Sequence, residues 1–457
     1  MVGLISSARL KNNTVESEMK RLYARFKQSD TDKKIIYIFI ATIFVTMLAW
    51  CVQQFIRVAI LDYTFFDGTT WGANASDYWM DFFNVNFWTQ KNFNPYTSDF
   101  HSSYPPLVLV ISKLFSFLAN YAYGSPHASN SFLGIFSYHL VFLGFTALSF
   151  MAWQRCMRDR GMEKKQRICI SAALLLTAPY LYLYGRGNYM VVVVTCLSYF
   201  LAWYKSEKRW QRELALVFLA VAAGIKLYPA LLAAILLKER RFADFFKTVI
   251  YTVAAFFLPF LVFTGGFSNI GVFWENLTSF QGSDQVSDRN YSMPTFLYYF
   301  VQFANGLKLG SIPQWVITVG AKLSSAILLC GLFLSLFAKR TWKALALITI
   351  ALIVYPAPSF IYSATMMLPV ILLFVICKEK TKLDYAYLFF FLVMLIPVQF
   401  GYLVSPEFFP YGLSVNNFLQ HFAMIIIFCM LSCESAVNIC RLCAGKIKGC
   451  IQKRREQ

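Results

Sequence analysis

Long apolar runs separated by short basic segments make up most of this chain. A helix that crosses a membrane needs roughly 20 consecutive apolar residues. Runs of about this length lie near residues 35–58, 130–153, 246–264, 314–338, 383–403 and 416–437. Each is expected to form a membrane-spanning helix. The pattern therefore predicts an all-α polytopic membrane protein without a soluble domain.

Three further apolar segments are bounded by basic residues at both ends and are interpreted as hairpins. They are 168–204, which turns at Arg186, 214–237, which turns near Lys226, and 344–377, which turns within 355–363. Their arms of about 11 to 17 residues hardly span about 30 Å of hydrocarbon at 1.5 Å per residue. We therefore expect the outer ends of these arms to stop inside a protein cavity, where irregular backbone is tolerated. The chain then has about twelve crossings.

Composition supports a membrane protein and explains the charge. The 457 residues are 58% apolar and 14% charged, whereas about 25% of residues are charged in soluble domains. A net charge of +19 is compatible with nucleic-acid binding, but the basic residues are clustered between the apolar runs. They lie in 155–167, 205–212, 238–241, 339–343, 378–382 and the C-terminal tail. The positive-inside rule predicts that these are cytoplasmic loops, with anionic membrane lipid as their partner and no role for nucleic acid.

The predicted organisation has three parts. Residues 1–34 form a basic cytoplasmic segment without a small-residue cleavage site, so the first apolar run is expected to be a retained anchor. Residues 35–440 form the integral membrane domain, and 441–457 form a basic cytoplasmic tail. The expected location is the cell (cytoplasmic) membrane, with several passes and both termini in the cytoplasm. No ATP-binding G-x-x-x-x-G-K-[ST] motif, H-E-x-x-H or G-x-S-x-G motif occurs, and no metal or cofactor is expected.

The large first outer loop, 59–129, carries candidate catalytic residues. Asp77 and Asp81 are four residues apart, so they would share one face of a helix. Flanking aromatic residues, which are Tyr78, Trp79, Phe82 and Phe83, are expected to bed this helix into the membrane interface. The alternative is that the two carboxylates are merely solvated or cap a helix.

Two cations stand at the tips of the short hairpins. Arg186 and Lys226 are expected on the same side of the membrane as Asp77 and Asp81, and cations in lipid usually face a cavity or a partner. Arginine binds a phosphate bidentately and lysine binds it as a point charge. The alternatives are that Arg186 caps a helix or reaches the headgroups, and that Lys226 is an ordinary loop residue. His101 would assist proton transfer, or be a plain interfacial histidine.

The order of motifs resembles a known enzyme family. The chain has D…DFFN…NPY…YPPL in its first outer loop, RGN and IKLYP at hairpin tips, NYSMPTFLYY in a later loop and finally PAPSFIYSATMMLP. Together these motifs resemble the polyprenol-phosphate-sugar-dependent glycosyltransferases of the C superfamily, and most of all family 87, with its mannosyl- and arabinofuranosyltransferases. The resemblance covers roughly residues 35–440.

The resemblance implies a fold and a reaction. The fold is a helical bundle of about twelve crossings, and the reaction is an inverting, metal-independent transfer of a sugar, most often mannose, from a polyprenyl-phosphate donor. The acceptor is a lipid or glycan on the extracytoplasmic side. The general base would be Asp77 or Asp81, a choice that remains open, and the donor phosphate would be bound by Arg186, Lys226 and Arg289. Substrate-pocket candidates from the motifs are Tyr96, His101, Tyr104, Asn188, Tyr228, Asn290, Ser292 and Tyr362.

One stretch departs from the family pattern. Relatives often carry a histidine near Ser-Trp in the last outer turn, where this chain has Ser359, Phe360, Ile361 and Tyr362. Two other classes of function remain open. A transporter or flippase of lipid-linked sugars would also gather cations in a cavity, although its internal symmetry is not seen in this sequence. A non-catalytic subunit for assembly or polymer export would need neither carboxylate.

Overall fold

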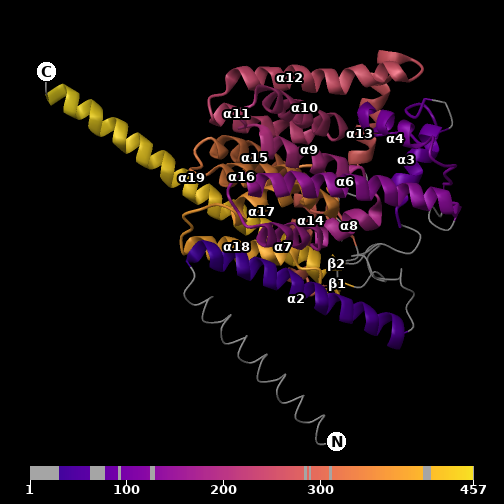
Figure 1. Cartoon of the computed structure of the whole chain (residues 1–457), viewed down its shortest axis with the longest axis horizontal. Coiled ribbons are helices and arrows are strands. Elements are labelled where there is room, and N and C mark those ends of the chain that lie inside the picture. Colours follow the sequence, from indigo (N-terminus) through magenta and orange to yellow (C-terminus); the bar gives the residue numbers. More distant parts are fainter. Residues whose placement is uncertain are drawn as a thin grey trace, which may run out of the picture.

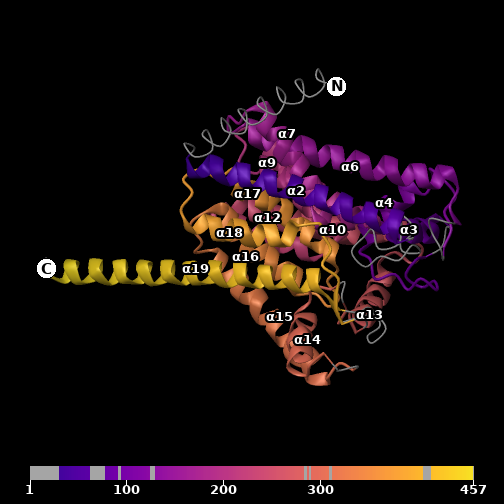
Figure 2. The same ribbon diagram turned by 90° about the horizontal axis from the view of Figure 1, so that it is seen from below.

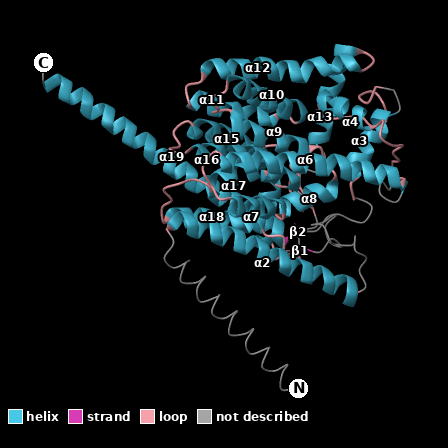
Figure 3. Ribbon diagram, viewed as in Figure 1, coloured by secondary structure: helices cyan, strands magenta, loops and turns pink. Residues whose placement is uncertain are grey.

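Most of the described chain is helical (Figure 3). The computed structural model describes residues 30–61, 78–90, 94–123, 129–282, 286–287, 290–307, 311–404 and 413–455. Within these ranges two short strands, β1 (Tyr402–Val404) and β2 (Leu413–Ser414), pair antiparallel with Tyr402 opposite Ser414. The prediction of an all-helical membrane protein is confirmed. The basic segment 1–29 lies outside the described residues.

Within the described residues, five helical segments are long and apolar enough to cross a membrane, or six if one bent pair is a single span. The bent pair is α7 with α8, whose axes differ by 56°. The five are α2 (Thr31–Ile60), α6 (Phe132–Arg158), α12 (Phe242–Phe257) continued by η3 (Leu258–Val262), α15 (Gln314–Ser335) and α19 (Val415–Arg455). The larger number of about twelve crossings includes shorter helices and remains a prediction.

The shorter helices complete the bundle. They are α3 (Met80–Gln90), α4 (Pro106–Phe115), α7 (Lys164–Leu175), α8 (Ala178–Arg186), α9 (Met190–Trp203), α10 (Arg209–Ile225), η2 (Tyr228–Ala233), α11 (Ala234–Lys238), η4 (Gly266–Ser268), α13 (Asn269–Gly282), α14 (Met293–Ala304), α16 (Thr341–Val354), η5 (Ile361–Met366), α17 (Met367–Val375) and α18 (Leu383–Leu395). Helix breaks at 187–189, 226–227 and 355–360 fall where the sequence predicts the hairpin tips.

Short and long helices occupy different environments. In α16 every residue from Trp342 to Val354 is buried, and α9 and α17 are nearly as enclosed. The long helices instead expose apolar side chains, such as Leu48 and Phe55 of α2. A helix of 14 residues, the length of α16, rises only about 21 Å, less than the hydrocarbon thickness. Because protein surrounds these arms, their ends need not reach a lipid-facing surface.

The apolar run 383–403 does not form the full-length helix that was expected. Helix α18 ends at Leu395, and Ile396 is extended with φ −62° and ψ 125°. The next residue is Pro397, which has no backbone N–H and disfavours the helical conformation of the residue before it. The expectation of a full-length helix was therefore wrong, because Pro397 ends the helix and was visible in the sequence.

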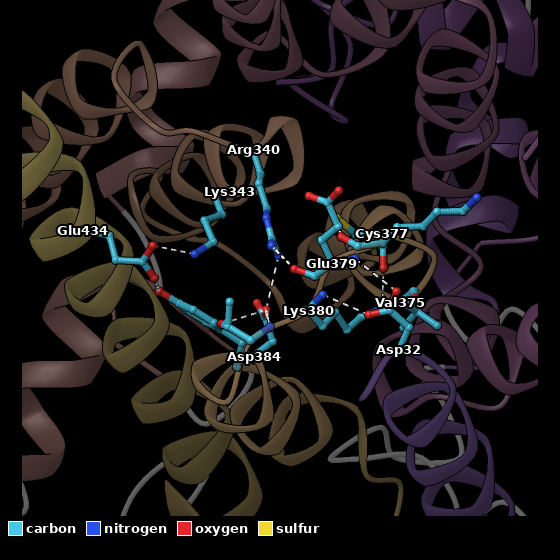
Figure 4. A network of polar contacts seen from close by, with 12 residues as sticks. Asp32, Arg340, Lys343, Val375, Cys377, Glu379, Lys380, Asp384 and Glu434 are labelled. Carbon is cyan, nitrogen blue, oxygen red and sulfur yellow. Dashed lines mark hydrogen bonds and ion pairs between the residues drawn. The ribbon is translucent and has the colours of Figure 1, made fainter. Parts of the chain in front are cut away.

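Charged residues clamp one end of the bundle (Figure 4). Arg340, just before α16, lies 3.2 Å from the carboxylate of Asp384 in α18, and Lys343 of α16 lies 2.5 Å from Glu434 of α19. Asp32 of α2 accepts hydrogen bonds from the backbone N–H groups of Glu379 and Lys380. These contacts tie four helices together.

Other basic loops meet at this same end. Lys205, which follows α9, pairs with Glu239, which follows α11, at 2.6 Å. The hydroxyl of Thr341 lies 3.4 Å from Glu239, which connects this group to the start of α16. Basic loops far apart in sequence therefore share one end of the bundle, the end beyond which α19 projects (Figures 1 and 2). That these loops lie on the cytoplasmic side of the membrane remains a prediction.

Removing the guanidinium of Arg340 should destabilise the fold. Asp384 is only 1% exposed, so Arg340→Ala leaves a buried carboxylate without its cation. We expect the free energy of unfolding to fall by about 3 kcal/mol, measured by denaturant unfolding in mixed micelles. The control is Arg158→Ala, because Arg158 and Asp159 are 3.8 Å apart and more than half exposed. An equal effect of the two changes would contradict a special role for the buried pair.

Candidate active site

The candidate site is built around an ion pair between two distant segments. Asp81, in the first turn of α3, lies 2.8 Å from Nη2 of Arg186, the last residue of α8. Their side chains are only 10% and 12% exposed. The second carboxylate oxygen of Asp81 accepts a hydrogen bond of 2.6 Å from the amide of Asn188. A carboxylate and a guanidinium predicted to face one chamber are thus in direct contact.

A backbone contact holds the ends of α3 and α8 together. The N–H of Trp79 donates to the carbonyl of Gly185 at 2.7 Å. Gly187 ends α8 in the left-handed conformation, with φ +68°, and a Cβ atom there would lie 2.9 Å from the Cα of Trp79. Glycine is suited to this position because it adopts positive φ without strain and permits the close approach. This junction fixes Asp81 and Arg186 relative to each other.

The aromatic residues around Asp81 are buried in protein, which corrects the expectation that they lie in the membrane interface. Tyr78, Trp79, Phe82 and Phe83 are all less than 10% exposed. Trp79 stacks on Tyr138 of α6, with ring centroids 5.1 Å apart. The helix also begins only at Met80, so Tyr78 and Trp79 belong to a turn. Aromatic rings are as favourable in a protein core as at a membrane interface, so composition did not distinguish the two.

Lys226 lies beside this pair, at the break between α10 and η2. Its backbone is extended, with φ −137° and ψ 123°, and Pro229 follows in the first turn of η2. The ammonium lies 5.0 Å from the ring centroid of Tyr104 and 5.9 Å from that of Tyr362. Aromatic faces attract a cation without occupying its N–H donors. Among the described residues the ammonium of Lys226 has no hydrogen bond or ion pair, so these donors are available to a ligand.

The charge of Lys226 is sensitive to pH. Removal of its side chain from water lowers the pKa of Lys226 to about 8, although the negative charge of Asp81 acts in the opposite direction. The ammonium is therefore present below about pH 8 and is lost as the pH rises through that value. The influence of Asp81 also indicates that the carboxylate and the ammonium are close in space.

Tyr104 connects Lys226 to the ion pair. Its hydroxyl is hydrogen-bonded to the side chain of Asn188, and burial raises its pKa well above the usual value. The phenol therefore remains protonated. Its backbone carbonyl accepts a hydrogen bond of 3.2 Å from the hydroxyl of Tyr96, which is itself fully buried against Phe260 and Phe273. Tyr96 therefore helps to hold Tyr104 in position.

Tyr362, from the predicted hairpin 344–377, lies near the ammonium of Lys226, as Tyr104 does. Tyr362 stacks on Tyr182 of α8, with centroids 6.2 Å apart, and the hydroxyl of Tyr228 is hydrogen-bonded to Ser363. Tyr182 and Ser363 were not among the site residues predicted from the sequence. A signal for Tyr182 was available, because it lies four residues before Arg186 and thus on the same face of α8.

Asn290 joins two loops that follow different helices. Its side-chain oxygen accepts hydrogen bonds of 2.8 Å from the backbone N–H groups of Ser292 and Ser359, and the N–H of Tyr291 donates to the carbonyl of Ser359. Ser292 is fully buried beside Thr295. The side chain of Asn290 and the backbone of Tyr291 therefore hold the 355–360 turn that precedes Tyr362.

Three further candidates were named from the sequence. Asp77 and Arg289 are outside the described residues, so the predicted sharing of a helix face by Asp77 and Asp81 is not tested. His101 is exposed, with φ +41°, and the structure records no contact between it and the Asp81 cluster. In the described ranges no three His, Cys, Asp or Glu side chains are grouped to hold a metal ion.

The model of glycosyltransferase family 87 matches residues 100–363, more than half of the chain. The chain belongs to glycosyltransferase family 87. No curated protein matches it. The matched region of this membrane glycosyltransferase contains Tyr104, Arg186, Asn188, Lys226 and Tyr362, whereas α3 with Asp81 precedes it. The resemblance seen in the motifs is thus confirmed.

The junction of Gly187 with Trp79 can be tested by two alanine substitutions. Gly187→Ala should lower the melting temperature of the purified glycosyltransferase more than Gly161→Ala does. Both glycines have positive φ, +68° and +74°, but nothing lies within 4 Å of a Cβ at Gly161. Gly161→Ala therefore reports only the backbone strain of about 1 kcal/mol, and the difference reports the clash with Trp79. Equal shifts would show that the close approach does not matter.

Proposed function

We propose that this family 87 member is an inverting glycosyltransferase that moves a sugar, mannose in our assignment, from a polyprenyl-phosphate donor to an extracytoplasmic lipid or glycan acceptor. The observation that supports it best is the convergence of Asp81, Arg186 and Lys226. These residues come from α3, the end of α8 and the end of α10, and they form one group of a base and two cations.

The carboxylate of Asp81 is the candidate base in this proposal. It takes the proton of the acceptor hydroxyl as that oxygen attacks the anomeric carbon of the sugar. The new bond forms between the acceptor oxygen and the anomeric carbon, and the bond from that carbon to the phosphate oxygen breaks. Because the leaving phosphate is stable as an anion, no acid is needed to protonate it, unlike the two carboxylates of inverting hydrolases. Asp77 remains the alternative base.

The two cations are assigned to the donor phosphate. The donor is a phosphodiester with one negative charge, and the polyprenyl phosphate that leaves carries additional charge. Lys226 presents its N–H groups between the rings of Tyr104 and Tyr362. Arg186 contributes its guanidinium while it remains paired with Asp81. Preorganised cations in a site with little water stabilise the charge that develops in the transition state.

The same ion pair supports a second role for Asp81. Its two oxygens already bind Arg186 and Asn188, so it also orients these side chains toward the donor. The two roles have different kinetic consequences. Loss of a base lowers kcat, whereas loss of an orienting group mainly raises the KM of the donor.

The first test is transfer of radiolabelled mannose from polyprenyl-phosphate-mannose to a panel of lipid and glycan acceptors by the purified protein. We expect Asp81→Asn to lower kcat by about a thousandfold, the range for loss of a general base. Asp77→Asn is assayed in parallel, since a loss there alone would assign the base to Asp77. The control is Asp99→Asn, a change in an exposed carboxylate of the same loop. Full activity of both Asp81→Asn and Asp77→Asn would disprove the mechanism, and a flippase would tolerate both changes.

The second test uses pH. The pKa of Lys226 is lowered to about 8, so kcat/KM for the donor should fall as the pH rises through that value. The donor phosphodiester does not titrate in this range. In Lys226→Arg the cation remains charged, because the pKa of arginine is above about 12, and the alkaline fall should disappear. A wild-type fall that persists unchanged in Lys226→Arg would assign the titration to another group.

A further inference from the structure

A cavity lies at the far end of the helix that carries Asp81. It has a volume of about 470 Å³ and is lined by the ends of α3 and α4, the segment that follows α4, and the start of α6. Ligand sites commonly have volumes of about 300–1,000 Å³. Asp81 and Gln90 are nine residues apart on α3, which corresponds to about 13 Å along the helix axis. The cavity is therefore separate from the candidate active site.

The polar lining suits an anion. Lys113, in the last turn of α4, is half-buried, and among the described residues it has no hydrogen bond or ion pair for its ammonium. Around it are the side chains of Gln90, Ser116 and Asn120, and none of the described residues that line the cavity is a carboxylate. Gln90 and Asn120 are fixed by a mutual hydrogen bond of 2.8 Å. One available cation among neutral polar side chains matches a phosphate group with a single negative charge.

The rim of the cavity is apolar and exposed. Phe117 is 80% exposed and Leu133 is 54% exposed, and both line the cavity. Leu114, which follows Lys113, and Phe132, which precedes Leu133, are also exposed. Such a rim next to a cationic pocket fits a ligand with an anionic head and an apolar tail.

The length of α6 places the cavity near the level of the lipid headgroups. Leu133 is the second residue of α6, a candidate span of 27 residues. A helix of that length rises about 40 Å, which is close to the thickness of a bilayer with its headgroups. The other end of α6 carries Arg155 and Arg158, which belong to the basic segment 155–167. The cavity is thus at the end of this span that is opposite to its basic end.

From these observations we propose that the cavity binds an anionic glycerophospholipid. The phosphate lies against Lys113, the headgroup hydroxyls contact Gln90 and Asn120, and the acyl chains follow Phe117 and Leu133. The proposal does not depend on the sugar donor or on the transfer reaction, because no residue of the cavity belongs to the Asp81 site.

Binding can be measured by native mass spectrometry of the full-length protein, titrated in detergent with phosphatidylglycerol and, separately, with phosphatidylcholine. We expect phosphatidylglycerol to be bound preferentially. Lys113→Gln should weaken its binding about tenfold, the effect of one hydrogen bond to a charged group, and Lys113→Arg should retain it. The matched control is Lys322→Gln, because Lys322 is an exposed lysine on another candidate span, α15.

Three results would overturn the proposal. If Lys113→Gln binds phosphatidylglycerol as tightly as the wild type does, Lys113 does not contribute to lipid binding. If Lys322→Gln loses as much affinity as Lys113→Gln, anionic lipid is attracted to the basic protein in general and not to this cavity. Binding of soluble glycerol phosphate as tightly as phosphatidylglycerol would show a phosphate site without a role for the apolar rim. A melting temperature of Lys113→Gln equal to that of the wild type establishes that its fold is intact.

Discussion

A charged side chain among apolar helices is costly unless another charge or a dipole compensates it, and this requirement shapes both ends of the molecule. At one end the cost is met within the protein, by pairs such as Lys343 with Glu434 and Arg340 with Asp384. At the other end Asp81 and Arg186 compensate each other. The described residues offer the ammonium of Lys226 two aromatic faces and the nearby charge of Asp81, but no ion pair or hydrogen bond. The charged side chains of the first arrangement are paired with each other, whereas the ammonium in the second is still able to bind an anion.

Much of this organisation follows from the sequence because hydropathy and charge are strong signals in membranes. Basic residues on both sides of 168–204 required a turn, and the turn falls at Gly187, directly after Arg186. The same argument placed Lys226 at a helix break. The pairing of Arg186 with Asp81 depends on this placement, since a hairpin tip can meet the start of α3 only when both lie at the same end of the bundle.

Other features could not be predicted because they depend on contacts between distant segments. The approach of Trp79 to Gly187 needs a particular crossing of α3 and α8, which no local pattern encodes. An aromatic residue also gives the same signal in the sequence whether its ring faces lipid or packs inside the protein. Phe82 and Phe83 were therefore assigned to the interface although they are buried. The early end of α18 is different, because Pro397 was visible and its effect on the preceding residue is well defined.

The imbalance of charge around Lys226 has a consequence for turnover. Among the described residues of the cluster, one carboxylate faces two cations, which leaves one positive charge at pH values below about 8. A donor with one negative charge would neutralise the cluster, but a polyprenyl phosphate product carries more negative charge and would be held more tightly. In a transferase of the proposed type, departure of the spent carrier would then be slower than transfer itself. The carrier would act as an inhibitor that competes with fresh donor.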